Sequence, residues 1–212
     1  MKKIIQKFYL FLTVFTVTVM SCQKDSIEPV MELTIDSKQK VLTVEKNGVG
    51  IEFCLLNENG EPATIFNEGE DFRFHLAITN NVEPDTAMYM PICLDCGGYI
   101  PDKFYVMNAQ GDTIGRPFYF RGIVYIKTQC PVINKWDSFI LDIPWTESRE
   151  NWYICTLIAH GSKNKLLPKG EYYTSFVHKF CLNFLSLPPI SEKPDEFICT
   201  DNISFKINFK IK

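Results

Sequence analysis

The sequence of 212 residues predicts an all-β protein whose main part folds as a single antiparallel β-sandwich. From residue 41 onward, short stretches of alternating polarity are separated by turn residues at intervals of about 8 to 15. Aromatic residues make up 14% of the chain, a share that favours strands. In no window do apolar residues recur with a sustained helical period.

The first predicted core strand follows the turn at Asn47-Gly48. Successive side chains of a strand point to opposite faces. Ile51, Phe53 and Leu55 should therefore point one way, and Glu52 and Cys54 the other. Before this strand, an edge strand is expected near residues 31–35.

Two later segments alternate most clearly. Residues 71–80 place Phe72, Phe74, Leu76 and Ile78 on one face, and residues 203–211 alternate Ile or Phe with Ser, Lys and Asn over nine positions. Each strand should cover a core with one side and meet water with the other. Further strands are predicted at 103–108, 113–120, 122–128, 138–143, 152–158 and 171–180.

The N-terminus predicts an exported, lipid-anchored chain. Three lysines precede an uncharged apolar run at 8–20, which is shorter than the roughly 20 residues of a membrane-spanning helix. The run ends at Val19-Met20-Ser21-Cys22, which resembles the lipobox of bacterial lipoproteins. The resemblance implies cleavage before Cys22 and lipidation of its thiol. The alternatives are an ordinary secretory signal and an uncleaved N-terminal helix.

The predicted organisation is therefore a lipoprotein signal peptide at 1–21, a lipidated N-terminus and tether at 22–40, and a sandwich domain at 41–212. Gln23-Lys24-Asp25 resembles the signal that sends Bacteroidetes-type lipoproteins to the outer face of the outer membrane, with display toward the periplasm as the alternative. Three of the 22 basic residues and none of the 25 acidic ones precede Cys22. The mature chain is thus acidic, which argues against a nucleic-acid partner.

Seven cysteines follow Cys22, and in an exported chain they tend to form disulfides. Cys181 and Cys199 bracket a proline-bearing stretch, so we expect a bridge between them. An odd count leaves at least one thiol free. Cys93 and Cys96 have the spacing of half a zinc site, but no second pair completes it. Structural disulfides or inert thiols are therefore favoured over metal binding or redox chemistry.

The remaining candidates are aromatic or acidic. Trp136, Trp145 and Trp152 fall close together near predicted strand ends, where aromatics can contact a sugar ring or a protein, although a Trp in a sandwich also commonly lies in the core. Glu147 and Glu150 suggest a polar loop. No arrangement predicts a catalytic nucleophile, a cofactor or a metal site.

Several turn-and-strand motifs resemble one known domain. They are Gly69-Glu70 entering a strand, Asn80-Asn81 leaving it, the hairpin at Gly111-Asp112, and the turn 168–172. Together they resemble the immunoglobulin-like domain of the intracellular proteinase inhibitor family and its relatives among Bacteroidetes lipoproteins. The resemblance implies an immunoglobulin-like sandwich over residues 50–212 and, less directly, inhibition of a protease through a loop such as 186–194.

We therefore expect a non-catalytic binding or accessory module of the cell envelope, with a glycan or a protein as its ligand. Its oligomeric state is left open. The alternatives are a protease inhibitor and a structural envelope protein.

Overall fold

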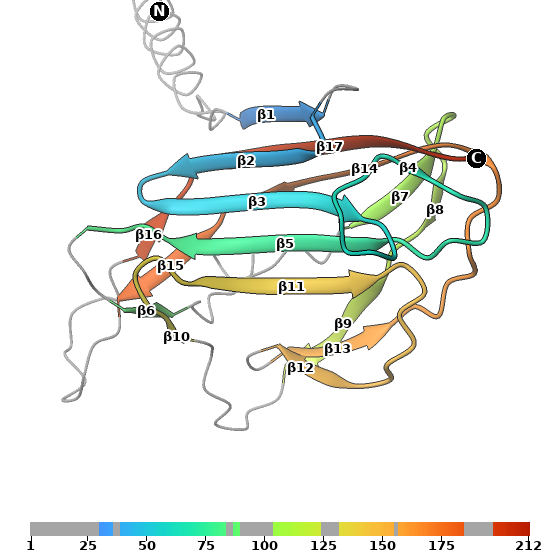
Figure 1. The fold of residues 1–212 in the computed structure, drawn as a ribbon. Helices are drawn as coiled ribbons and strands as arrows, with labels where there is room; N and C mark the ends of the chain where they lie inside the picture. Colours follow the sequence, from blue (N-terminus) through green and yellow to red (C-terminus); the bar gives the residue numbers. More distant parts are fainter. Residues whose placement is uncertain are drawn as a thin grey trace, which may run out of the picture.

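The computed structural model describes residues 30–35, 39–83, 87–89, 104–123, 132–154, 157–184 and 197–212. Every regular element in these ranges is a β-strand, which confirms the all-β prediction (Figure 1). The same ranges hold no helix with the length and apolar character needed to cross a membrane. Cys22 lies outside the described residues.

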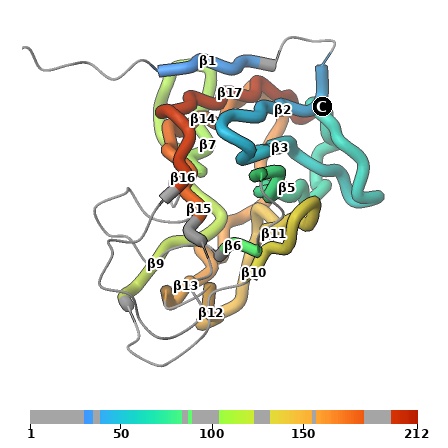
Figure 2. Tube along the Cα trace, turned by 90° about the vertical axis from the view of Figure 1, so that its left-hand side faces the viewer, coloured from blue at the N-terminus to red at the C-terminus, as the bar shows by residue number. Residues whose placement is uncertain are grey.

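Two larger sheets form the sandwich. The first consists of β1 (Val30–Ile35), β17 (Asn202–Ile211), β14 (Gly170–His178), β7 (Tyr105–Asn108) and β8 (Thr113–Gly115), with β4 (Ile65–Phe66) paired to the end of β17. The second consists of β11 (Ser138–Pro144), β5 (Arg73–Asn80), β3 (Val49–Leu56) and β2 (Val41–Lys46). In Figure 2, strands β17, β14 and β7 lie on one side and β3, β5 and β11 on the other.

Two smaller sheets extend this sandwich. One consists of β10 (Val132–Ile133), β6 (Met88–Tyr89), β15 (Cys181–Phe184) and β16 (Phe197–Cys199). The other consists of β12 (Trp152–Ile154), β13 (Leu157–Gly161) and β9 (Phe118–Ile123). In Figure 1 the first of these sheets lies at the left-hand end of the main sheets, and the second lies below β11.

Phenylalanines fill the space between the two large sheets. Phe53 of β3 contacts Phe176 of β14 edge-on at 4.9 Å between ring centroids, and Phe72 meets Phe209 of β17 at 5.1 Å. Such offset and edge-to-face geometry adds about 0.5–1.5 kcal/mol per pair to the burial of the rings. These contacts hold the first sheet rigidly against the second, and so fix the outer face of β14 and β17.

The edge of β17 is covered by two parallel strands. β1 pairs with residues 202–207, and β4 pairs with Lys210 and Ile211. The predicted edge strand near 31–35 thus exists as part of the main sheet. It belongs to the sandwich although it precedes the predicted domain start at residue 41.

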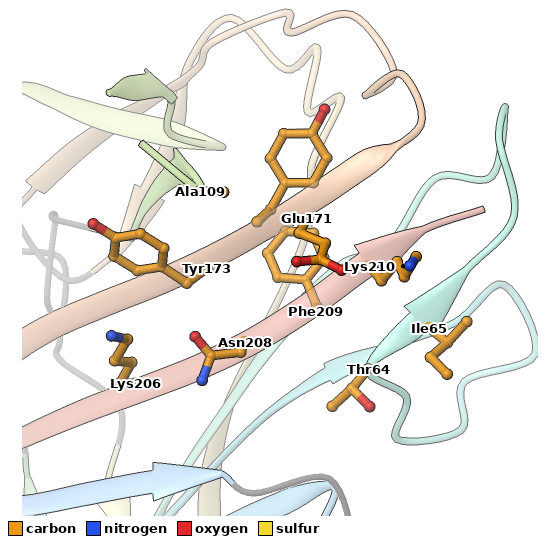
Figure 3. A pocket seen from close by; sticks show the side chains of 10 residues that line it. Thr64, Ile65, Ala109, Glu171, Tyr173, Lys206, Asn208, Phe209 and Lys210 are labelled. Carbon is orange, nitrogen blue, oxygen red and sulfur yellow. Dashed lines mark hydrogen bonds and ion pairs between the residues drawn. The ribbon is translucent and has the colours of Figure 1, made fainter. Parts of the chain in front are cut away.

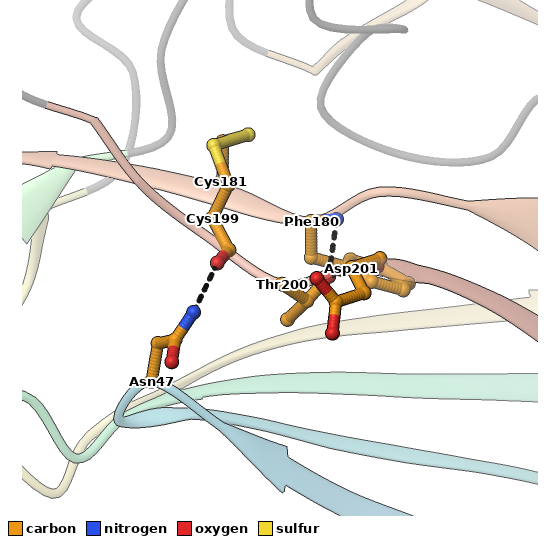
Figure 4. Close-up of a disulfide and its surroundings, with 6 residues drawn as sticks. All are labelled: Asn47, Phe180, Cys181, Cys199, Thr200 and Asp201. Atoms are coloured by element: carbon orange, nitrogen blue, oxygen red, sulfur yellow. Dashed lines mark hydrogen bonds between the residues drawn. A yellow bond between two sulfur atoms is a disulfide. The ribbon is translucent and has the colours of Figure 1, made fainter. Parts of the chain in front are cut away.

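The predicted disulfide is present. Cys181 and Cys199 face each other in the β15–β16 pair and are bridged, with a Cα–Cα distance of 4.1 Å. Side chains around it tie β16 to the main sheets (Figure 4): the Asn47 side-chain amide donates to the Cys199 carbonyl at 2.7 Å, and the Phe180 N–H donates to the Thr200 hydroxyl at 3.0 Å. Among the described cysteines, Cys54 is a free, buried thiol, which agrees with the prediction of at least one free thiol.

Cys54 points away from Phe53, as predicted, yet it is fully buried, because it lies between Val41 and His75 on the neighbouring strands. Two strand predictions are wrong. Segment 152–158 is not one strand but an antiparallel pair, β12 and β13. Segment 113–120 is likewise divided between β8 and β9, which belong to different sheets. Cys93, Cys96 and loop 186–194 lie outside the described residues.

Candidate functional site

Among the described residues, an open groove on the outer face of the first sheet is a candidate site (Figure 3). Its volume is about 610 Å³, within the range of small-molecule sites. The lining side chains used below are Thr64 and Ile65 at β4, Glu171 and Tyr173 on β14, and Lys206, Asn208 and Lys210 on β17. All of them are carried by strands or strand ends.

Strand alternation produces this groove. On β17, Phe205, Ile207 and Phe209 point into the core, so the residues between them must point outward. Tyr173 lies opposite Asn208 in the antiparallel register, and Glu171 lies opposite Lys210. The core contacts of the alternate residues therefore hold the groove side chains in place.

Two close interactions organise the groove. The Lys206 ammonium lies over the Tyr173 ring, 4.7 Å from its centroid, and the Lys210 ammonium pairs with the Glu171 carboxylate at 3.4 Å. In Figure 3, Asn208 lies between Lys206 on one side and Thr64 on the other. Exposed pairs such as Glu171 with Lys210 contribute little stability, about 0–1 kcal/mol.

The other polar groups of the groove are free to bind a ligand. Within the described part of the chain, the side chains of Asn208 and Thr64 and the Tyr173 hydroxyl have no hydrogen-bond partner, and Lys206 has no carboxylate partner. Ile65, which is 53% exposed, adds an apolar surface. The groove thus combines unpaired donors and acceptors with aromatic and aliphatic surface.

The three predicted tryptophans do not form one platform. Trp145 is a core residue, 1% exposed, stacked on Phe72 and donating from Nε1 to the Lys165 carbonyl at 2.8 Å. It is therefore not available to a ligand, which corrects that prediction. Trp152 is half-buried against Phe118, with the Arg149 guanidinium 4.3 Å from its ring centroid.

Trp136 is different because it is 67% exposed and its φ is +70°. It occupies a tight turn closed by the Asp137 N–H donating to the Asn134 carbonyl at 3.0 Å, with Lys135 Nζ 5.0 Å from its ring centroid. Such a turn position favours Gly or Asn, and a bulky residue there costs about 1 kcal/mol or more. Trp136 is thus the one predicted tryptophan whose position suits contact with a partner.

A cysteine, a histidine and a carboxylate lie side by side on the outer face of the second sheet. Cys54, His75 and Asp142 are cross-strand neighbours, and His75 Nδ1 is 2.6 Å from Asp142 Oδ1. Burial raises the pKa of the Cys54 thiol to about 12, and the charges of Glu52 and Asp142 add to that shift. A nucleophilic cysteine needs a lowered pKa. The surroundings of Cys54 raise its pKa instead, so they do not activate the thiol.

Glu147, which the sequence places in a polar loop, is only 4% exposed. Burial raises the pKa of its carboxyl, but hydrogen bonds from the Arg149 side chain and backbone more than offset this, leaving the pKa below its ordinary value of 4.5. The only hint of this burial in the sequence is Arg149, two positions later, which can pair with the Glu147 carboxylate. Glu147 acts as a structural anion, since it fixes its own loop.

Among the described residues, no group of three or more His, Cys, Asp and Glu side chains has an arrangement that could hold a metal ion. The groove residues escaped sequence analysis because their strands, β4, β14 and β17, are distant in the chain. The alternation of residues 203–211 did indicate that Lys206 and Asn208 face water.

Comparisons with protein-family models, curated proteins and solved structures found no match to this chain.

Proposed function

We propose that this protein is a lipid-anchored, non-catalytic binding module of the outer membrane that takes a saccharide in the groove on β14 and β17. The observation that carries the proposal is the set of unpaired polar side chains around Asn208, beside the aromatic ring of Tyr173. Amide, hydroxyl and ammonium groups match the hydroxyls of a sugar, and aromatic and aliphatic surface matches its C–H faces.

The size of the groove favours a small ligand over a protein. A stable protein interface covers about 800 Å² on each partner and has an apolar core. The groove is lined by ten residues, fewer than the roughly 20–30 on each side of a typical interface, and it carries charged or amide side chains such as Lys206 and Asn208. Its walls stand on paired strands, so little conformational entropy is lost when a ligand binds.

The anchor is supported by the N-terminal sequence. Acyl chains on Cys22 would hold the chain at the membrane, with each buried methylene contributing about 0.8 kcal/mol. Replacing Cys22 with Ala should move the protein from the membrane fraction to the soluble fraction and abolish labelling by fatty acid. Retention of the label in the variant would refute lipidation at Cys22.

Binding is tested with the mature protein extracted in detergent and applied to a glycan array. We expect binding to a subset of glycans, lost on replacing Tyr173 or Asn208 with Ala. Val177→Ala is the matched control, because Val177 is an exposed residue of β14 that does not line the groove. Absence of binding to any glycan, or equal binding by all four proteins, would refute a saccharide site here.

A second candidate function is contact with a protein partner through Trp136. The observation favouring it is the exposure of a tryptophan at a strained turn position. Tryptophan is enriched among residues that dominate protein interfaces. Crosslinking in intact cells, with Trp136→Asn compared with the unchanged protein, would identify such a partner by its loss in the variant.

A further inference from the structure

We infer that the groove selects saccharides bearing a carboxylate, such as uronic-acid sugars, and that the Lys206 ammonium binds that carboxylate. This inference rests on the proposed saccharide site and deepens it by naming the ligand class. It follows from how the charges in the groove are distributed between its two ends.

Lys206 is the uncompensated charge of the groove. No carboxylate of the described residues lies within ion-pair distance of its Nζ, whereas Lys210, two positions further along β17, is paired with Glu171 at 3.4 Å. A carboxylate entering the groove therefore finds one ammonium group with no competing anion among the described residues. Charge-assisted hydrogen bonds are about twice as strong as neutral ones.

Tyr173 positions this ammonium group. The ring lies 4.7 Å from Lys206 Nζ, which restricts an otherwise flexible side chain over the groove. A cation–π contact is an electrostatic attraction to the face of the ring and uses no lone pair. The three N–H groups of the ammonium can therefore still donate hydrogen bonds. Lys206 is thus preorganised and still able to donate to a ligand oxygen.

The neighbours of Lys206 suit the rest of an acidic sugar. Asn208 follows Lys206 on the same face of β17, at a spacing of about 7 Å along the strand. Its amide can donate to and accept from ring hydroxyls. Thr64 and Ile65 on the far side of Asn208 offer a further hydroxyl and an apolar contact.

Glu171 limits the ligand to a single negative charge near Lys206. Its carboxylate neutralises Lys210, so the second end of the groove has no net positive charge for another anion. The excess of acidic residues over basic ones also repels polyanions. We therefore expect selection of one carboxylate and not of densely sulfated chains.

The test uses two oligosaccharides of equal length that end in glucuronic acid or in glucose, titrated against the detergent-extracted mature protein. We expect about tenfold tighter binding of the acidic sugar, the ratio for one charge-assisted contact of about 1.4 kcal/mol. Lys206→Gln should reduce that ratio to about one, and Lys206→Arg should retain part of the preference. Lys46→Gln is the control, since Lys46 pairs with Asp201 away from the groove.

The remaining outcomes distinguish failure of the carboxylate inference from failure of the proposed saccharide site. Equal affinity for both sugars in the unchanged protein would overturn the inference while the saccharide site stands. Binding of neither sugar nor of any arrayed glycan would overturn both. A preference that survives Lys206→Gln, or tighter binding of a sulfated polymer than of the single carboxylate, would also overturn the inference. Because Lys206 points to solvent, unchanged urea unfolding of the variant excludes misfolding as the cause.

Discussion

The bridge between Cys181 and Cys199 should contribute about 3 kcal/mol to the free energy of unfolding. The two residues are 18 positions apart, and closing a loop of that length in the unfolded chain removes entropy worth about 3 kcal/mol at 25 °C. The double variant Cys181→Ala/Cys199→Ala removes this constraint. With a urea dependence of about 2 kcal/mol per molar, the unfolding midpoint should fall by about 1.5 M.

The assay is equilibrium urea unfolding followed by tryptophan fluorescence, which Trp145 reports from the core. Reductant provides the matched control: under oxidising conditions the unchanged protein should be more stable than the double variant, and in reductant the two midpoints should coincide. A midpoint difference below about 0.3 M under oxidising conditions would refute the reasoning. It would mean that contacts such as Asn47 to Cys199 already restrain this hairpin in the absence of the bridge.

Three further predictions concern other parts of the fold. Gly161→Ala should destabilise by about 2 kcal/mol or more, measured by the same unfolding assay, because the added methyl group would lie 2.4 Å from the Glu147 carbonyl oxygen. Glu147 has a lowered pKa, so its stabilising contribution is present above pH 4.5 and is lost as the pH falls through the folded-state value; Glu147→Gln should flatten the acid limb of a stability–pH curve. Trp136→Asn should leave the unfolding free energy unchanged or raise it by about 1 kcal/mol, since Asn tolerates positive φ, and a loss above 1 kcal/mol would show that Trp136 has a structural role.

Alternation within one segment was enough to predict the strands that line the core. The period of two at residues 203–211 correctly placed Phe205, Ile207 and Phe209 inside. Alternation places Cys54 on the face opposite Phe53 but does not indicate that Cys54 is buried there, because the cross-strand neighbours that cover it come from other segments. The alternation within a segment indicates on which side of a strand a residue lies. Whether that residue is buried depends on neighbours from distant segments, which the alternation does not identify.

The same limit applies to the candidate site. Exposure of Lys206 and Asn208 follows from the sequence, yet their proximity to Tyr173 and Thr64 depends on the order of β4, β17 and β14 in the sheet. That order includes two parallel pairings to one strand, which no local signal specifies. For the tryptophans, the sequence supplied residue type and spacing, whereas burial of Trp145 depends on Phe72 and Lys165.

The parallel pairing of β1 with β17 relates the proposed anchor to the proposed site. Only eight positions separate Cys22 from Val30, so a lipidated Cys22 would hold the start of β1 within about 28 Å of the membrane surface. Val30 pairs with Asn202, and Asn208 lies about 20 Å further along β17 in the direction in which β1 also runs. Because both strands run from the end of the sheet that Val30 starts, the proposed groove lies about 20 Å along the sheet from the point where the proposed tether would join it.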